Sequence, residues 1–247
     1  VKYKKYLIED PLINGLVLLF TSEGIDVTRK SVYGYAYHPV KGGWIKGFYP
    51  FPSTVFLRKT VKKDDSKLLR RLVGHNFFNS VSFNKWEMWQ WFSSHNQLRS
   101  HTAETVLMEN LNDVKKLLNK HQQIYLKPFA GMQGNGIYLL SKQEEGYNIR
   151  YRLQESNVLT FLENWEAVID FISFYVNIGK YIAQQQIPLL KNNGRIMDFR
   201  VITIKDEVGN WYVPGIITKM GDENSIVSNI SSGGTAERTW DTLQRIY

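Results

Sequence analysis

A lysine followed by a glycine-rich segment is the feature of this sequence that most directly suggests chemistry. The run YLKPFAGMQGNGIYLL, residues 125–140, places Lys127 at the end of a strand-like stretch and then three glycines before a second apolar stretch. Glycine permits positive φ and lets backbone N–H groups approach anionic oxygens that a Cβ would block. A turn of this kind between two strands either covers the phosphates of a nucleotide, as in kinase-like sites, or is a loose hairpin connection.

The surrounding residues exclude two common nucleotide-binding motifs. No Gly-Lys-Ser/Thr sequence follows the glycines, so the segment is not a P-loop, and a strand follows where a Rossmann fingerprint has a helix. Two further cations, Arg200 and Lys219, occur on strand-like runs, where a cation facing a core is costly unless an anion compensates it. Alternation along a strand leaves open whether they point inward, where an anion would compensate them, or face solvent. Asp198 then either orients Arg200 or is an ordinary ion-pair partner.

Composition limits the classes of protein to which these residues belong. The chain has 247 residues, 43% of them hydrophobic, which is enough for one large core or two modest ones. Cysteine is absent and the five histidines lack metal-ligand spacing, so a structural zinc site is not expected. Apolar runs are shorter than a bilayer span and no secretion signal is seen, which makes the cytoplasm the expected location.

The formal charge of +8 is compatible with binding to a polyanion, including a nucleotide triphosphate. Basic residues form only short clusters along the chain, and no helix-turn-helix, zinc-finger or RNP aromatic motif occurs. We therefore do not expect dedicated nucleic-acid binding, and we interpret the clusters as solvated faces.

The elements that must position these residues follow from hydrophobic periodicity. Buried strands are predicted at residues 16–20 and 54–57, with turns and short hairpins in the Gly/Pro/Tyr-rich segment between them. Helices are predicted at residues 64–73, 84–95, 112–121 and 161–176, and the tryptophans of the second are expected to pack in the core. Seven further runs read as strands, namely QIYLKP, GIYLL, YNIRYRL, KYIAQQQI, FRVITIKD, WYVPGIITKM and SIVSNI, with DEVGN as a hairpin turn. The chain is thus predicted to be α+β, with a mostly antiparallel second half.

The order of these runs resembles the ATP-grasp superfamily. Lys127 and the glycine-rich loop come first, and KYIAQQQIPLL, MDFRVITI, GIITKM and VSNISSGGT follow. More closely, the chain resembles the endospore coat-associated YheC/YheD-like family, which shares a Tyr-Leu-Lys-Pro strand, a DFR strand, a tryptophan-containing hairpin and an asparagine before a Gly-Gly pair. The resemblance extends upstream through FFNSVSFNKWEMWQWF and covers most of the chain. It implies a small α/β region at residues 1–75, an N-terminal ATP-grasp subdomain with flap and hinge at 76–187, and the start of the C-terminal subdomain at 188–247.

The resemblance assigns roles to particular residues. The nucleotide-binding residues that it implies are Lys85, Lys127, Gly131, Gln133, Gly134, Asn135, Gly136, Gln184, Gln185, Gln186 and Ile187. Those implied at the transferring phosphoryl group are Arg200, Lys219 and Asn229, the last beside a Gly-Gly turn at residues 233–234. The triple glutamine stands where ATP-grasp hinges often carry a glutamate, so it either reads adenine mainly through its backbone or is a polar sheet edge.

The implied activity is ATP-dependent ligation of a carboxylate to an amine or thiol through an acyl phosphate, with ATP and Mg²⁺ and with substrates that the sequence does not identify. The usual magnesium ligands follow the Gly-Gly turn in this superfamily, and only AERTWDTLQRIY follows Thr235 here. We expect a fragment of a longer protein, with a naturally short inactive chain and unidentified metal ligands as the alternatives. The competing function is a catalytically inactive, ATP-grasp-like structural or assembly protein of the spore coat, with coat proteins as partners.

Overall fold

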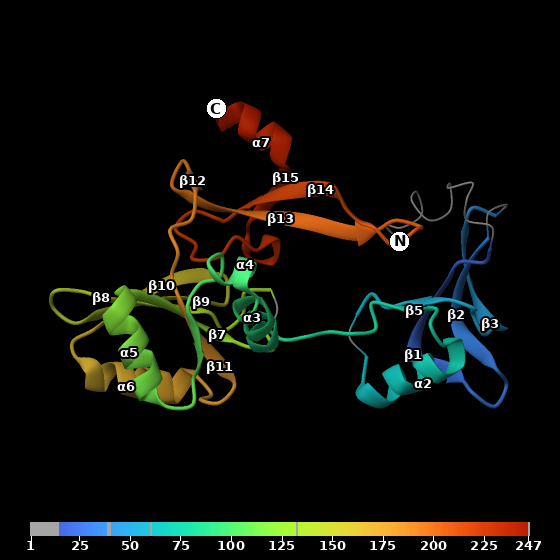
Figure 1. Ribbon diagram of the computed structural model, residues 1–247, viewed down its shortest axis with the longest axis horizontal. Coiled ribbons are helices and arrows are strands. Elements are labelled where there is room, and N and C mark those ends of the chain that lie inside the picture. Colours follow the sequence, from blue (N-terminus) through green and yellow to red (C-terminus); the bar gives the residue numbers. More distant parts are fainter. Residues whose placement is uncertain (1–14, 39–40, 60, 132, 247) are drawn as a thin grey trace. The chain divides into compact units, whose positions relative to one another are not determined.

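The chain divides between Ser82 and Phe83 into two units, and each has its own cluster of buried apolar side chains. The structure is a computed structural model that describes residues 15–38, 41–59, 61–131 and 133–246. Figure 1 shows the elements of both units in their order along the chain. None of the helices in these ranges is long and apolar enough to span a bilayer.

The first unit is built on an antiparallel sheet of β1 (Leu18–Asp26), β2 (Ser31–His38) and β3 (Gly43–Pro50). Side chains of β2 alternate between buried and exposed along most of the strand, as expected when one face of a sheet is covered. Two short parallel strands, β4 (Val55–Phe56) and β5 (Phe77–Phe78), flank helix α2 (Lys63–Val73). The expectation of short hairpins between residues 31 and 52 is wrong, because β2 and β3 pair over eight positions.

The second unit contains a six-stranded antiparallel sheet, which confirms the predicted character of this half of the chain. Its strand order is β10-β9-β8-β7-β11-β6. The strands are β6 (Thr105–Leu107), β7 (Gln123–Pro128), β8 (Tyr138–Lys142), β9 (Tyr147–Leu153), β10 (Ser156–Leu162) and β11 (Tyr181–Gln185). Figure 1 shows α5 (Leu111–His121) and α6 (Trp165–Tyr175) on one face of this sheet. The core lies between those helices and the strands.

Asparagine side chains begin the helices of the second unit. Asn84 caps α3 (Lys85–Ser94) and Asn110 caps α5, each in a reciprocal capping box with an acidic residue three positions later. Asn164 accepts a hydrogen bond from the Ala167 N–H at the start of α6. A short helix, α4 (Asn96–Arg99), follows α3. These caps fix where the chain enters each helix and hence which face it presents to the sheet.

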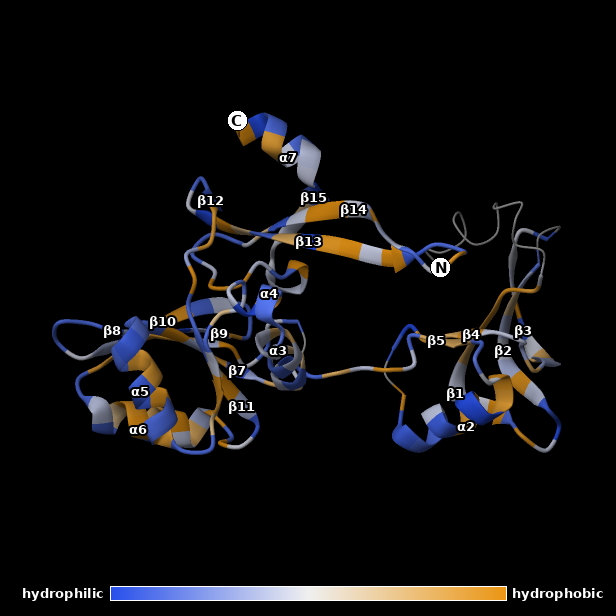
Figure 2. Ribbon diagram, viewed as in Figure 1, coloured by the Kyte–Doolittle hydropathy of each residue, from blue (hydrophilic) through white to orange (hydrophobic). Residues whose placement is uncertain are grey.

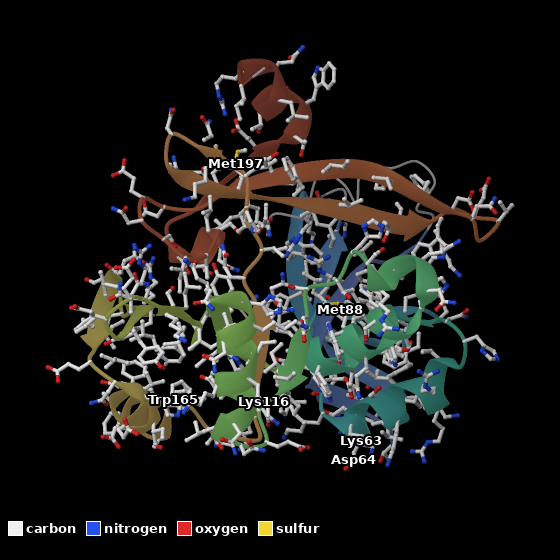
Figure 3. The ribbon with its side chains drawn as sticks, turned by 60° about the vertical axis from the view of Figure 1, so that its left-hand side comes forward. Lys63, Asp64, Met88, Lys116, Trp165 and Met197 are labelled. Atoms are coloured by element: carbon white, nitrogen blue, oxygen red, sulfur yellow. The ribbon has the colours of Figure 1, made fainter. Side chains whose placement is uncertain are left out.

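A second sheet in this unit has the order β12-β13-β14-β15. Its strands are β12 (Lys191–Asn192), β13 (Arg195–Lys205), β14 (Trp211–Met220) and β15 (Thr235–Arg238). Figure 2 shows that β13 and β14 are largely apolar. Helix α7 (Thr239–Ile246) packs on β14 and β15, and Met197, labelled in Figure 3, lies on the same face of the sheet. A single 3₁₀ turn, η1 (Ile230–Ser232), precedes β15.

Three local expectations fail. The predicted helix at 161–176 starts only at Trp165, because the run before it pairs with β9 as strand β10. The predicted strand SIVSNI is instead a loop followed by η1. Helix α3 has no fully buried residue, so its tryptophans are not core residues; Trp86 and Trp89 stack on each other, with ring centroids 5.0 Å apart.

Candidate functional site

A cavity of about 250 Å³ lies between the two sheets of the second unit. It is lined by residues from β7, β11, β13 and the loop before η1: Tyr125, Lys127, Ile137, Gln184, Gln185, Ile187, Leu189, Ile196, Asp198, Ile226, Val227, Ser228 and Asn229. A larger cavity of about 350 Å³ opens beside Met220 and Thr235, on the side of the second sheet where α7 packs, and it contains no predicted site residue. The cavity between the sheets is therefore the candidate site.

Lys127 is the cation that reaches furthest into this cavity. Its Nζ donates to Gln184 Oε1 at 2.7 Å and lies 4.6 Å from the centre of the Tyr125 ring. Burial, together with the nearby positive charge of Lys85, lowers the pKa of Lys127 to about 8. No carboxylate in the described ranges forms an ion pair with Lys127, since its partners are neutral. A buried ammonium without a counter-ion is suited to bind an anionic ligand.

Gln184 is held in one orientation by its neighbours. Thr105 Oγ1 donates to the Ala103 carbonyl at 2.9 Å, and so it accepts the hydrogen bond from Gln184 Nε2, also at 2.9 Å. The amide oxygen of Gln184 therefore faces Lys127. This chain of hydrogen bonds from β6 through β11 to β7 fixes the position of the Lys127 ammonium group.

Lys85 fixes the stem of the glycine-rich loop. As the first residue of α3, it donates from its backbone N–H to the Phe129 carbonyl at 2.9 Å. Its Nζ donates to the carbonyls of Pro128 and Gly131 at 2.8 and 2.5 Å. Burial lowers the pKa of Lys85. Both lysines thus lie at the base of the loop, close enough for their charges to interact.

The glycine-rich loop lies against the segment that precedes β15. Gln133, Gly134 and Gly136 have φ of +63°, +79° and +68°, a region that glycine adopts at little cost. A Cβ on Gly134 would be 3.0 Å from Asn229 Oδ1, and a Cβ on Gly136 would be 2.7 Å from the Tyr181 hydroxyl. These two positions require glycine for close approach as well as for backbone conformation.

Hydrogen bonds tie the loop to the same segment. The Ser231 and Ser232 hydroxyls donate to the Gln133 carbonyl at 3.2 and 3.4 Å, and the Arg152 guanidinium donates to the Ser232 carbonyl at 2.5 Å. The Tyr125 hydroxyl donates to the Ile226 carbonyl at 3.0 Å. These bonds hold the loop and the segment before β15 together next to the cavity.

The second sheet contributes one ion pair to the site. Lys219 Nζ is 3.1 Å from Asp198 Oδ1, and the other oxygen of Asp198 accepts a hydrogen bond from the Ser228 hydroxyl. Of the two alternatives for Asp198, the structure has the ordinary ion pair, formed with Lys219, rather than a contact that orients Arg200. Arg200 is exposed on the same face of β13 as Asp198, and it lies outside the cavity lining.

The structure gathers most of the predicted residues, but not all of them. Five line the cavity directly: Lys127, Gln184, Gln185, Ile187 and Asn229. Six others adjoin it through the contacts above: Lys85, Gly131, Gln133, Gly134, Gly136 and Lys219. Arg200 and Asn135 are exposed, and the Gln186 N–H bonds to the Gln123 carbonyl beside β7.

Sequence reasoning missed several residues of the site. Tyr125 and Lys127 are two residues apart on β7, so the period of a strand places both on the same face. That signal was available in the run QIYLKP. Thr105 and Ser228 carry no local signal, since each enters the site only through pairing with residues far away in the sequence.

The cavity does not fit a magnesium ion with this chain's own side chains. Across the ranges that the structure describes, no group of three or more histidine or acidic residues could hold a metal. Asp198 is the one carboxylate lining the cavity, and both its oxygens are engaged by Lys219 and Ser228.

The model of one protein family matches residues 74–247, and its description is "YheC/D like ATP-grasp". The chain therefore has the ATP-grasp fold. Its two α+β layers enclose a cavity that Lys127 lines and that the glycine-rich loop adjoins. Within that class, the chain belongs to the YheC/YheD-like ATP-grasp family.

Two relatives from Bacillus subtilis (strain 168) match nearly the whole chain. The endospore coat-associated protein YheD is 28% identical over 243 residues, which cover 94% of this chain and 52% of YheD. The endospore coat-associated protein YheC is 20% identical over 225 residues, which cover 88% of this chain and 62% of YheC. The chain therefore spans about half the length of YheD.

A solved structure also matches. It is D-alanyl-alanine synthetase A from Vibrio cholerae O1 biovar eltor str. N16961, with a TM-score of 0.37 and 10% identity over 90% of this chain and 58% of that one.

Proposed function

We propose that the second unit binds ATP in the cavity between its two sheets. The observation that carries this proposal is the buried Lys127 ammonium, which lines the cavity with only neutral partners. An anionic phosphate would compensate this charge and strengthen its interaction in a site of low dielectric. Lys85 and the backbone N–H groups of residues 133–136 would complete the cradle for the phosphates.

The adenine is assigned to the hinge after β11. Gln184, Gln185 and Ile187 line the cavity at the end of this strand, where the backbone leaves the sheet. The N–H groups of Gln185 and Gln186 already bond to backbone carbonyls, so the edge of a purine would be read by the remaining backbone groups of this segment. Ile187, Leu189 and Ile196 would supply apolar surface for its faces. The amide oxygen of Gln184 is an acceptor fixed beside this position.

The reaction proposed for the whole protein is ligation through an acyl phosphate. A substrate carboxylate attacks the γ-phosphorus of ATP and releases ADP; an amine or thiol then attacks the acyl carbon, and inorganic phosphate leaves. Lys219 and Asn229 lie on the second-sheet side of the cavity, where they would stabilise the transferring phosphoryl group. Arg200, which is exposed on β13, would have to change its side-chain conformation to reach this group. Mg²⁺ would have to be held by ATP and by residues other than the described side chains.

The test of nucleotide binding is calorimetric titration of ATP and ADP, each with Mg²⁺, into the wild type and a Lys127→Met variant. We expect at least a tenfold loss of affinity, because the buried cation contacts phosphate directly. Lys142→Met is the matched control, since Lys142 is an exposed lysine on β8 of the same sheet. Equal affinities of Lys127→Met and wild type would refute the assignment.

A second measurement separates the ligase from the inactive coat protein. ADP release would be followed while mixtures of carboxylates and amines are added to the full-length protein. Release that depends on both additions supports ligation. Binding of ATP without any turnover would favour the structural alternative, in which the fold is kept as a scaffold. The names of YheC and YheD make association with the endospore coat the corresponding proposal for location.

A further inference from the structure

The net charge of the chain belongs entirely to its first unit. Residues 1–82 contain 14 lysines and arginines against six aspartates and glutamates, which gives +8. Residues 83–247 contain 17 of each kind, which gives zero. The short basic clusters of the first unit are therefore not balanced by acidic residues of the same unit, whereas the charges of the second unit cancel. A polyanion attracted by this charge would meet the first unit.

One face of the first sheet is rich in exposed aromatic rings. Tyr33 pairs across the strands with Phe48, and Tyr35 pairs with Lys46, so all four side chains lie on the same face. Phe48 is 58% exposed and the two tyrosines 43% and 45%. We call these four residues the aromatic face.

Cations are interleaved with these rings. Lys46 Nζ lies 5.2 Å from the centre of the Tyr33 ring and 5.7 Å from that of Tyr35. The Arg29 guanidinium lies 5.8 Å from the Phe48 ring, although it also contacts Asp26 at 3.6 Å. Lys46 forms no ion pair within the described part of the chain, so its charge is uncompensated by protein.

The opposite face of the sheet explains why the aromatic face is left open. Val32, Gly34 and Ala36, which alternate with the tyrosines along β2, are buried toward the interior of the unit. The rings on the other face are not part of the small buried cluster of this unit. Three exposed rings and the Lys46 side chain thus lie next to one another in a positively charged unit. Exposed apolar side chains on a protein surface are more often isolated than contiguous.

We propose that the aromatic face binds single-stranded nucleic acid. A sheet face that carries rings two residues apart, with a lysine and an arginine over them, matches a polymer in which planar bases alternate with phosphates. An acidic protein or an anionic vesicle would also use the cations and the rings, so both are alternative outcomes of the test; we favour nucleic acid because its planar bases stack on exposed aromatic side chains. The sequence lacks an RNP motif, so only the register of β2 and β3 brings these side chains together.

The test uses the full chain and a fluorescently labelled oligothymidylate, with binding followed by anisotropy. Phe48→Ala should weaken binding at least fivefold, in line with the cost of removing one stacking platform. Trp211→Ala is the matched control, because Trp211 is 69% exposed in the second unit and also has a lysine, Lys205, over its ring. This control should bind as the wild type does.

Lys46→Gln provides a readout that folding defects would not imitate. Removing one phosphate contact should lower the slope of log affinity against log salt by about one. No binding of oligothymidylate, equally tight binding of a duplex, or equal weakening by Trp211→Ala would overturn the proposal. So would tighter binding to heparin or phosphatidylglycerol vesicles that Phe48→Ala leaves unchanged, which would assign the face to another polyanion.

Discussion

The two units bury very different amounts of apolar side chain. In the second unit, fifteen buried residues form one cluster between the six-stranded sheet and its helices. In the first unit, the buried cluster of the described residues consists of Val55, Leu69 and Phe77. A large core can offset the cost of burying polar groups at its edge, whereas a small core leaves little free energy to spare.

The burial of lysine side chains follows this difference between the two cores. Lys127 and Lys85 are drawn into the second unit, where burial lowers the pKa of both. Lys46 of the first unit stays on the sheet surface over aromatic rings. The comparison indicates that a charged group is buried where the packing of a large core offsets its desolvation penalty. Where the core is small, the charged group stays at the surface.

The largest expected effect tests whether the two cores are independent. Leu140→Ala removes a fully buried side chain of β8 and should destabilise the second unit by about 3 kcal/mol. Leu69→Ala should destabilise the first unit by about 2 kcal/mol, because a small core can relax around the cavity. Differential scanning calorimetry should show each variant shifting a different transition. One shared transition in both variants would show that the units unfold together.

The second effect concerns the glycine-rich loop. Gly134→Ala should cost about 1–2 kcal/mol of unfolding free energy, since φ is +79° and the new Cβ would press on Asn229. Gly194→Ala is the control, because Gly194 has φ of +77° but no neighbouring atom within 4 Å. Only Gly134→Ala should also weaken ATP binding. Equal loss of ATP affinity in both variants would remove the loop from the site.

The elements that local patterns determine were predicted well. The leucines of α2 and the turn of Asp206 and Gly209 between β13 and β14 lie where their spacing and turn chemistry place them. The last two residues of β10, Phe161 and Leu162, were predicted as helix because their apolar side chains suit both periods until pairing with β9 decides, and the rest of this strand was not predicted. The run SIVSNI fails as a strand because the Ser225 hydroxyl bonds to the N–H and C=O of Val227 and makes a local turn.

The residues of the site also fall into two groups, those that the sequence indicates and those that depend on the pairing of distant strands. Lys127 and the hinge, assigned from the resemblance of continuous runs of sequence, line one cavity, and the glycine-rich loop adjoins it; their roles toward a nucleotide stay predictions. The pairing of Asp198 with Lys219 was not predictable, because a bulge between Ile202 and Ile204 shifts the register of β13 and β14 by one. Counted back from the turn without that bulge, Asp198 would oppose Thr218 on the strand. One extra residue on β14 thus places Lys219 instead of Thr218 opposite the carboxylate.

The third effect follows from the lowered pKa of Lys127, about 8. Phosphate binds the protonated amine, so ATP affinity should fall by up to about tenfold per pH unit as pH rises above 8. Stability without ATP should change in the opposite direction. Between pH 8 and the unfolded lysine value of about 10.4, the unfolded chain holds more protons, so the free energy of unfolding rises with pH.

Titrations with ATP at several pH values, paired with chemical denaturation, would measure both slopes. Lys127→Met should abolish the two slopes together while leaving the protein folded. A wild-type affinity that stays constant from pH 7 to pH 9.5 would show that Lys127 does not carry the phosphate contact.

The smallest expected effect is a different change in the stability of the two units when salt is added. Raising NaCl from about 0.05 M to about 0.5 M shortens the screening length several-fold and weakens charge repulsion. The first unit, at +8, should gain stability by less than about 1 kcal/mol. The second unit is neutral and has exposed pairs such as Lys120 with Glu104, whose hydrogen bonds from Lys120 and His121 lower the pKa of Glu104. Screening should weaken such pairs slightly, so the second calorimetric transition should stay or fall while the first rises. A rise of equal size in both transitions would mean that salt acts through general hydrophobic burial rather than through the uneven distribution of charge between the units.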